Sequence, residues 1–191
     1  METFDKKEKL IVSSYNIIND TANNNIVLQS ISGMLGFPFT IIADGAVIFT
    51  HYAPMISRIQ TVFNREPLTQ DMLMPIFKSI SSDLILDIAV DKFAGQLPVL
   101  GIYFNAICAK ALTWRIGILF AILACIDEIP ETEKISRIAS FIRLIFPQSE
   151  IFKFVKPDFQ KYKRIMGNVL HDSDTGFFDK VQEAINIFDL K

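Results

Sequence analysis

The residue with the clearest chemical potential in this sequence is Asp44, a carboxylate inside a stretch of apolar residues. A carboxylate among apolar side chains must pair with a cation, accept hydrogen bonds or be protonated. If a helix begins near Thr40, Asp44 lies in its first turn, where the helix dipole favours an anion by about 0.3–1 kcal/mol. Three roles therefore stay open: helix capping, buried pairing with Lys110 or Arg115, and contact with a ligand or ion.

His51 and Arg58 follow Asp44 at intervals of seven residues, which places all three on one face of a helix. A single histidine on such a face is most often a satisfied core or boundary residue. The other histidine of the chain, His171, is far away in the sequence. We therefore treat Asp44, His51 and Arg58 as candidates for contact with a ligand or partner rather than for catalysis.

Lys110 and Arg115 interrupt a second apolar stretch. Long cationic side chains commonly bury their aliphatic stems and extend their charged ends to water. The alternative is that both face Asp44 across a central pair of helices and fix its register, because a buried charge without a partner costs several kcal/mol. Both residues are candidates for contact with a ligand or partner.

The motifs of enzymes and metal proteins are absent from the sequence. Cys108 and Cys125 stand seventeen residues apart, a spacing that fits neither a metal site nor a secreted disulfide framework, so we expect buried free thiols. No Gly-x-Ser-x-Gly, His-Glu-x-x-His or Gly-x-x-x-x-Gly-Lys-Ser/Thr motif occurs. We expect no catalytic residue, no bound metal and no cofactor.

Length and composition point to one folded domain covering residues 1–191. The chain is 50% apolar, 12% aromatic and 21% charged, which excludes disorder and allows a sizeable core. Nineteen Lys and Arg oppose twenty-one Asp and Glu, for a net charge of −2. Phosphate contacts need clustered cations, so this balance argues against nucleic acid as a partner.

The apolar residues recur at intervals of three and four, which predicts an all-α bundle of about seven helices. Two of these helices, within residues 40–126, are apolar almost all round and should be long and central. Asn23 to Asn25 suggest a break after the first helix, because asparagine competes with the helix through local side-chain bonds. The helices expected before residue 130 cover Phe4–Ala22, Ile26–Leu35, Thr40–Phe63, Leu68–Phe93 and Val99–Ile126.

Beyond Pro130 the expected helices are amphipathic, each with one apolar stripe and one charged face. The stripes are Ile135, Ile138, Ile142 and Ile145; then Phe159, Tyr162, Met166 and Val169; then Phe177, Val181, Ala184, Ile185 and Phe188. We expect these helices, over about 131–191, to pack on the central pair. The spacing from Gly117 to Ala121 further indicates a close approach between helices.

Neither long apolar segment meets the usual criteria for an isolated membrane span. Lys110 and Arg115 lie near the centre of Leu97–Ile126, and Asp44 lies in the middle of Ile31–Ile56. Intramembrane charges can pair inside a bundle, so insertion stays open as an alternative. The N-terminal segment lacks the apolar run of a secretory signal, and we expect a cytoplasmic protein, free or at the inner membrane.

Three short motifs between Leu35 and Gly117 carry a family resemblance. Phe37-Pro38 is followed by Asp44 and, eleven residues later, by Met55-Ile56. Leu97-Pro98-Val99-Leu100-Gly101 forms a proline-x-x-glycine turn before the last apolar helix, and Thr113 and Gly117 stand four apart within that helix. In order and spacing, this stretch resembles the bacterial domain of unknown function 697.

That family is a hydrophobic helical domain, often fused to small GTPases or found in inner-membrane proteins. The resemblance implies an interaction role and a separate GTPase as one candidate partner. Two features depart from it: His51-Tyr52 stand where the family tends to carry a glutamine, and this sequence has no phosphate-binding loop. Residues 130–191 lie outside the resemblance.

These observations favour a non-catalytic helical interaction module that binds a protein partner or a membrane surface. Its basis is an excess of Phe and Ile over the needs of a core of this size, together with the missing catalytic motifs. One alternative is a carrier of a lipid or other hydrophobic ligand, with Asp44, His51 and Lys110 as polar anchors. The other is an integral helical hairpin.

Overall fold

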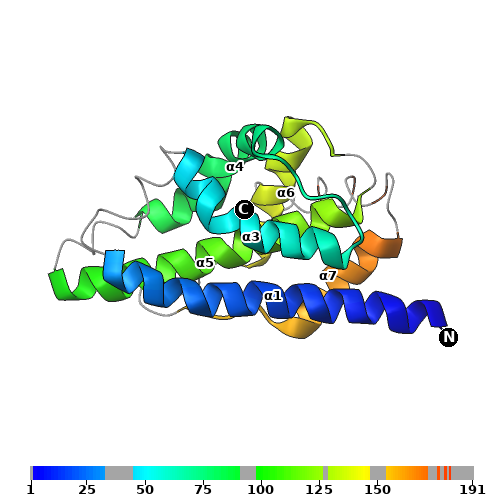
Figure 1. The fold of residues 1–191 in the computed structure, drawn as a ribbon, viewed down its shortest axis with the longest axis horizontal. Helices are drawn as coiled ribbons and strands as arrows, with labels where there is room; N and C mark the ends of the chain where they lie inside the picture. Colours follow the sequence, from blue (N-terminus) through cyan, green and yellow to red (C-terminus); the bar gives the residue numbers. More distant parts are fainter. Residues whose placement is uncertain are drawn as a thin grey trace.

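The structure is a computed structural model that describes residues 2–32, 45–90, 98–126, 129–146 and 154–171, together with Gly176, Asp179 and Val181. Within these ranges the chain forms six α-helices and no strand, which confirms the all-α class (Figure 1). The helices are α1 (Glu2–Ser32), α3 (Gly45–Val62), α4 (Gln70–Val90), α5 (Pro98–Cys125), α6 (Thr132–Ile145) and α7 (Phe159–His171). The described helices thus number six, where about seven were expected.

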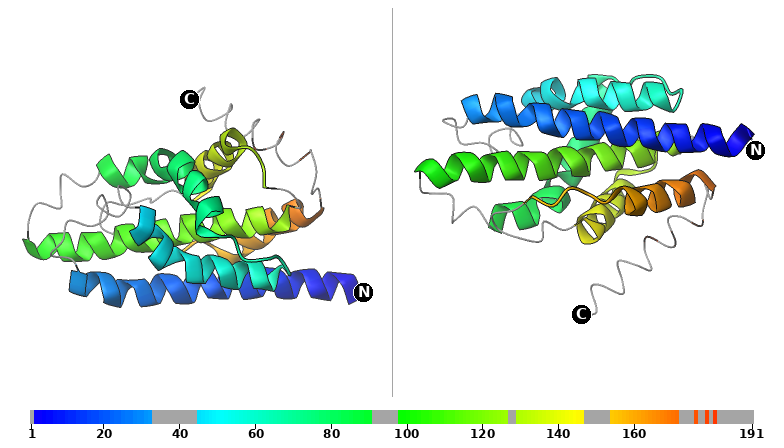
Figure 2. Two further views of the ribbon diagram at one scale, coloured as in Figure 1. Left: turned by 45° about the horizontal axis from the view of Figure 1, so that its top comes forward. Right: turned by 90° about the horizontal axis from the view of Figure 1, so that it is seen from below.

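Helix α5 occupies the centre of the bundle and contacts each of the other five described helices. Every residue from Ala111 to Cys125 is buried, so this half of α5 is covered on all sides. Figure 2 shows α1 running alongside α5, with α3 and α7 on opposite sides of that pair. The bounds of α5 agree with the helix predicted over Val99–Ile126, and its burial follows from its apolar surface.

Helix α1 is longer than the sequence suggested. The break expected at Asn23 to Asn25 is wrong, because a single helix continues to Ser32 and includes the segment that began at Ile26 in the prediction. Asn23 and Asn24 are exposed, so their amides can face water and need not compete with the backbone. The helix propensity of asparagine costs only about 0.7 kcal/mol, which the packing of α1 along α5 easily offsets.

The other long apolar helix of the prediction is only partly as expected. Its described part, α3, is not apolar all round, because Pro54, Arg58 and Thr61 are exposed along one side. The expectation of two long, highly apolar central helices is therefore wrong for α3, which buries one face against α5 and α1. Residues 33–44 lie outside the described part of the chain.

The amphipathic stripes of α6 and α7 lie where the sequence placed them. Ile135, Ile138 and Ile142 of α6 are buried, mainly against α4, and Tyr162, Met166 and Val169 of α7 are buried as well. Of the last predicted stripe, Val181 is described and buried, and the rest lies outside the described residues. None of the described helices combines the length and the apolarity that a bilayer span requires.

Helix α1 approaches α5 closely at Gly117. A Cβ atom added there would lie 2.6 Å from Cγ1 and 2.8 Å from Cγ2 of Ile18. Both atoms are bonded directly to Cβ of Ile18, a fully buried β-branched residue, so they cannot move without the helix. Glycine is needed here because it leaves room for the neighbouring side chain. Of the predicted pair Gly117 and Ala121, Gly117 thus lies at a close contact between two helices.

This contact predicts opposite effects for two glycine substitutions. Gly117→Ala should lower the free energy of unfolding by about 1–3 kcal/mol through overpacking, less the gain of up to about 1 kcal/mol from helix propensity. Gly167→Ala on α7 meets no atom within 4 Å and should raise the free energy of unfolding by about 0.5–1 kcal/mol. Urea unfolding followed by circular dichroism measures both. Equal stabilisation by the two substitutions would rule out the tight α1–α5 contact.

Candidate functional site

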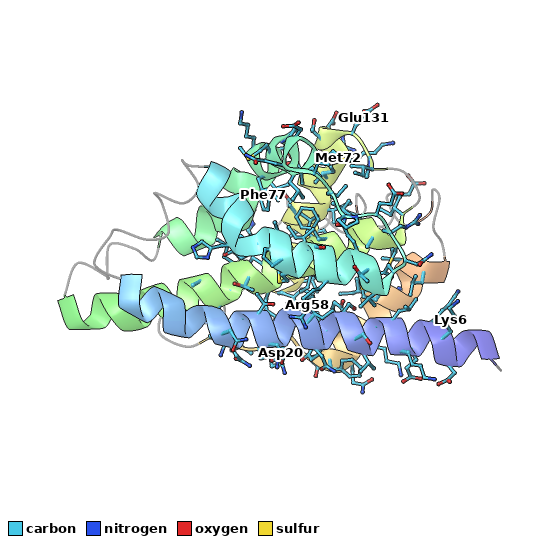
Figure 3. All side chains as sticks on the ribbon, viewed as in Figure 1. Lys6, Asp20, Arg58, Met72, Phe77 and Glu131 are labelled. Atoms are coloured by element: carbon cyan, nitrogen blue, oxygen red, sulfur yellow. The ribbon has the colours of Figure 1, made fainter. Side chains whose placement is uncertain are left out.

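Of the residues that the sequence proposed as a site, the structure describes four, and they lie on two helices. Asp44 lies outside the described residues, so its pairing with Lys110 or Arg115 stays a prediction. Both His51 and Arg58 lie on α3, where His51 is half-buried and Arg58 is exposed. Figure 3 labels Arg58. Lys110 and Arg115 lie on α5 and are associated with a pocket to which α3 contributes no lining residue.

This pocket, called the basic pocket below, has a volume of about 250 Å³ and lies where α5, the end of α6 and the start of α7 meet. An extended segment, residues 154–158, leads into α7 and closes one side. Its described lining combines three cations and one carboxylate with three aromatic rings: Arg115, Lys156, Lys161, Asp158, Trp114, Phe146 and Phe154. Ala111, Ile118, Ile145 and Val155 supply aliphatic surface.

Hydrogen bonds from α1 hold the extended segment in place. The Tyr15 hydroxyl donates to the carbonyl oxygen of Pro157 at 2.7 Å, and both residues are buried. Ser14, the residue before Tyr15 on α1, also contacts α7, because its hydroxyl and that of Tyr162 form a buried hydrogen bond of 2.7 Å. A buried carbonyl without a donor would cost about 1–3 kcal/mol, so these bonds fix the position of the pocket wall.

The start of α7 is capped within the same segment. The Asp158 carboxylate accepts a hydrogen bond of 2.8 Å from the backbone N–H of Lys161, the usual arrangement of an aspartate that precedes a helix. Pro157, which the sequence analysis associated with a helix start, precedes this cap. The cap satisfies one of the free N–H groups of α7 and directs Lys161 towards the pocket.

An aromatic cluster lies beside the pocket, and one of its members, Trp114, lines it. The Tyr15 ring packs against Trp114 with a centroid distance of 4.9 Å, against Phe159 at 5.0 Å and against Tyr162 at 5.4 Å. Tilted and edge-on pairs of this kind each add about 0.5–1.5 kcal/mol beyond burial. The cluster therefore joins α1, α5 and α7 directly beneath the extended segment.

Three lysines place their ammonium groups over aromatic rings at the pocket. Lys156 Nζ lies 4.8 Å from the ring centroid of Tyr15 and 5.8 Å from that of Trp114. Lys110 Nζ lies 5.3 Å from the Phe154 centroid, and Lys161 Nζ lies 5.3 Å from that of Phe146. Lys161 Nζ also donates to the carbonyl oxygen of Ile145 at 2.5 Å. The rings orient these cations without neutralising their charge.

The pocket concentrates positive charge. Arg115 is only 1% exposed, so its guanidinium carries a charge into the interior beside the pocket. Burial lowers the pKa of Lys110, and the positive charge of Lys156 nearby lowers this pKa further. The repulsion between like charges at one site is reduced when an anion binds between them, and this reduction favours binding. The arrangement is suited to binding an anionic group.

The Cys125 thiol on α5 is buried and does not line the pocket. Burial raises the pKa of the Cys125 thiol to about 12, and its sulfur donates to the Ala121 carbonyl oxygen at 3.2 Å. A thiol of this kind stays protonated and unreactive. Across the described ranges, no three His, Cys, Asp or Glu side chains gather closely enough to hold a metal ion.

Sequence reasoning identified two of the cations and missed the others. Lys110 and Arg115 were noticeable because they interrupt an apolar helix, whereas Lys156 and Lys161 lie in an ordinary polar context. The usable signal was the alternation of lysine with aromatic residues from Phe154 to Lys161, just before an aspartate cap. The link from this segment to Tyr15 spans 142 residues and could not be found from local pattern.

We compared the chain with family models, with curated proteins and with solved structures, and none of them matches it.

Three buried tyrosines predict a loss of stability in alkali. Burial raises the pKa of Tyr52 to about 12, a rise opposed by the Thr113 side chain, and burial also raises the pKa of Tyr15 and of Tyr162. An unfolded tyrosine ionises near pH 10. Between pH 10 and 12 the unfolded state therefore holds fewer protons than the native state, and the free energy of unfolding falls as pH rises.

The Tyr52→Phe variant isolates one of these groups. Between pH 8 and pH 11 the free energy of unfolding should fall in both proteins. The fall should be about 1 kcal/mol smaller in Tyr52→Phe than in the wild type. Urea unfolding at pH 8, 10 and 11 measures the difference. Parallel pH dependences of the two proteins would contradict the burial of the Tyr52 hydroxyl.

Proposed function

We propose that this protein is a non-catalytic helical interaction module that binds a partner protein by receiving an anionic group of that partner in the basic pocket. The observation that carries the proposal is the charge of the pocket. Its described lining holds Arg115, Lys156 and Lys161 against the single carboxylate of Asp158, whereas the whole chain has a net charge of −2. Positive charge gathered on an otherwise acidic chain favours and orients anionic partners.

A protein suits this pocket better than a membrane surface does. Membrane-binding faces are typically protruding and rich in lysine and arginine, and they attract anionic lipids over a broad area. Here Arg115 is buried and the ammonium groups of Lys110 and Lys161 lie over aromatic rings in a recess. A flat headgroup layer reaches such cations less well than a side chain or chain end does.

The resemblance to the hydrophobic helical domain stays part of this proposal. We also propose that the chain forms one domain and that it is located in the cytoplasm or at the inner membrane. A GTPase carried on a separate chain is one partner that the resemblance suggests. The lipid-carrier alternative receives less support. The pocket opens to solvent at Val155, which is 49% exposed, whereas a carrier of long acyl chains needs an enclosed cavity.

Binding of a simple anion tests this function. A native-state site with a Kd of about 10 mM should raise the free energy of unfolding by about 1.4 kcal/mol in 0.1 M sodium acetate, relative to sodium chloride of equal ionic strength. Lys156→Glu should abolish the difference, because it reverses a charge on the exposed edge of the pocket. Urea unfolding followed by circular dichroism provides the measurement.

Lys9→Glu is the matched control. Lys9 is an exposed cation on α1, paired with Asp5 at 2.9 Å, and it does not line the pocket. This variant should keep the acetate effect. An equal acetate effect in the wild type and in Lys156→Glu would reject the proposal. Sedimentation with phosphatidylglycerol vesicles that depends on Lys156 would instead replace the protein partner by a membrane.

A further inference from the structure

We propose that the basic pocket recognises a carboxylate carried by an apolar residue, and that its natural occupant is the C-terminal residue of a partner polypeptide. This inference rests on the proposed function, because it names the chemical group that the interaction module binds. It follows from three properties of the pocket: its cations, its apolar lining and its size.

The cations form a convergent set rather than a scattered one. Arg115 and Lys156 line the pocket from two different segments of the chain. Lys110 lies beside the lining, over the Phe154 ring, and is close enough to Lys156 for the two ammonium groups to repel each other. Among the described residues, neither lysine forms an ion pair with a carboxylate. An incoming carboxylate would relieve this repulsion and accept charge-assisted hydrogen bonds from the ammonium groups.

The surface between these cations is apolar. Trp114 and the ring of Phe154 face the same cavity as Ile118 and Val155. An inorganic anion would gain no binding free energy from contact with this surface. An apolar side chain attached to the carboxylate would bury the surface and so favour binding. Full burial of one leucine-sized side chain contributes about 1.5–3 kcal/mol.

The helix start at the pocket disfavours phosphate as the ligand. Phosphate sites commonly use the free N–H groups at a helix N-terminus. Here Asp158 already occupies this position at α7, because its carboxylate accepts the Lys161 N–H bond. The remaining donors are side-chain cations beside aromatic rings, which suit a carboxylate on an apolar body.

The size of the pocket points to a chain end rather than to a complete small molecule. Its volume of about 250 Å³ is below the range of about 300–1,000 Å³ that is usual for small-molecule sites. One terminal residue with its side chain and carboxylate fits this volume, and the preceding residues can leave through the open side at Val155, which is 49% exposed.

A matched set of ligands tests the inference by isothermal titration calorimetry on the full chain. The probes are N-acetyl-leucine, its amide, acetate and inorganic phosphate. N-acetyl-leucine should bind with a Kd of about 1 mM, and both its amide and acetate should bind about tenfold more weakly, because each lacks one half of the recognised group. Lys156→Gln should weaken N-acetyl-leucine about threefold, and Lys9→Gln should leave it unchanged.

Two further peptides identify the source of the carboxylate. Gly-Ser-Gly-Ser-Leu with a free C-terminus should bind at least as tightly as N-acetyl-leucine, and the same peptide with an amidated C-terminus should lose this affinity. Binding of N-acetyl-leucine without binding of the free peptide would assign the site to small apolar acids and overturn the polypeptide occupant.

The pattern among the probes separates the two proposals. If acetate and phosphate bind in a Lys156-dependent manner as tightly as N-acetyl-leucine, the pocket is an anion site and the inference fails while the proposed function stands. If no anion binds, both fail. If the amide binds as tightly as the acid, the pocket is merely apolar and the charge has no role in recognition.

Discussion

The complete burial of the C-terminal half of α5 is the constraint from which the rest of the structure follows. Every residue from Ala111 to Cys125 is buried, and five other described helices contact α5. At Gly117, α1 approaches α5 so closely that Ile18 fills the space of a side chain. This contact fixes the position of α1 along α5 and therefore determines which side chains of α1 face the other end of the bundle.

The basic pocket is one result of that position. Tyr15 stands three residues before Ile18, so the α1–α5 contact brings its ring against Trp114 and its hydroxyl to Pro157. The extended segment is thereby held over the aromatic cluster, with Lys156 above it. Arg115 follows Trp114 on α5 and carries a charge into this region. Helix packing in the core and charge at the pocket are thus linked through neighbouring residues.

The sequence allowed the class of fold and several elements to be predicted, for physical reasons that differ from element to element. The stripes of α6 and α7 were predictable because burial on one face leaves a periodic pattern, and the bounds of α5 were predictable because a long apolar run ends at polar residues and prolines. The break at Asn23 was wrong because local propensity is weak against packing along a whole helix. The apolar face of α3 was overestimated, since apolar residues within a helix do not show which side a neighbour covers.

The candidate site was less predictable than the fold. Charges inside an apolar helix are conspicuous, so Lys110 and Arg115 could be identified without a structure. Lys156 lies over the Tyr15 ring of α1, which is far away in the sequence, and Lys161 lies over Phe146 at the end of α6. No local pattern reveals the contact with Tyr15. His51 and Arg58 share a helix with regular spacing, yet this helix contributes no residue to the lining of the pocket. Spacing along one helix identifies a shared face but not its neighbour.

The central claim is that the pocket beside Trp114 is where an anionic group binds, and the indole of this residue allows a direct measurement. Trp114 is the only tryptophan in the sequence, so its indole N–H gives a single assignable signal in a ¹H–¹⁵N spectrum. Titration with N-acetyl-leucine should shift this signal progressively and saturably, with the Kd found by calorimetry. Saturable binding that leaves the indole signal in place would put the ligand elsewhere on the protein and contradict the claim.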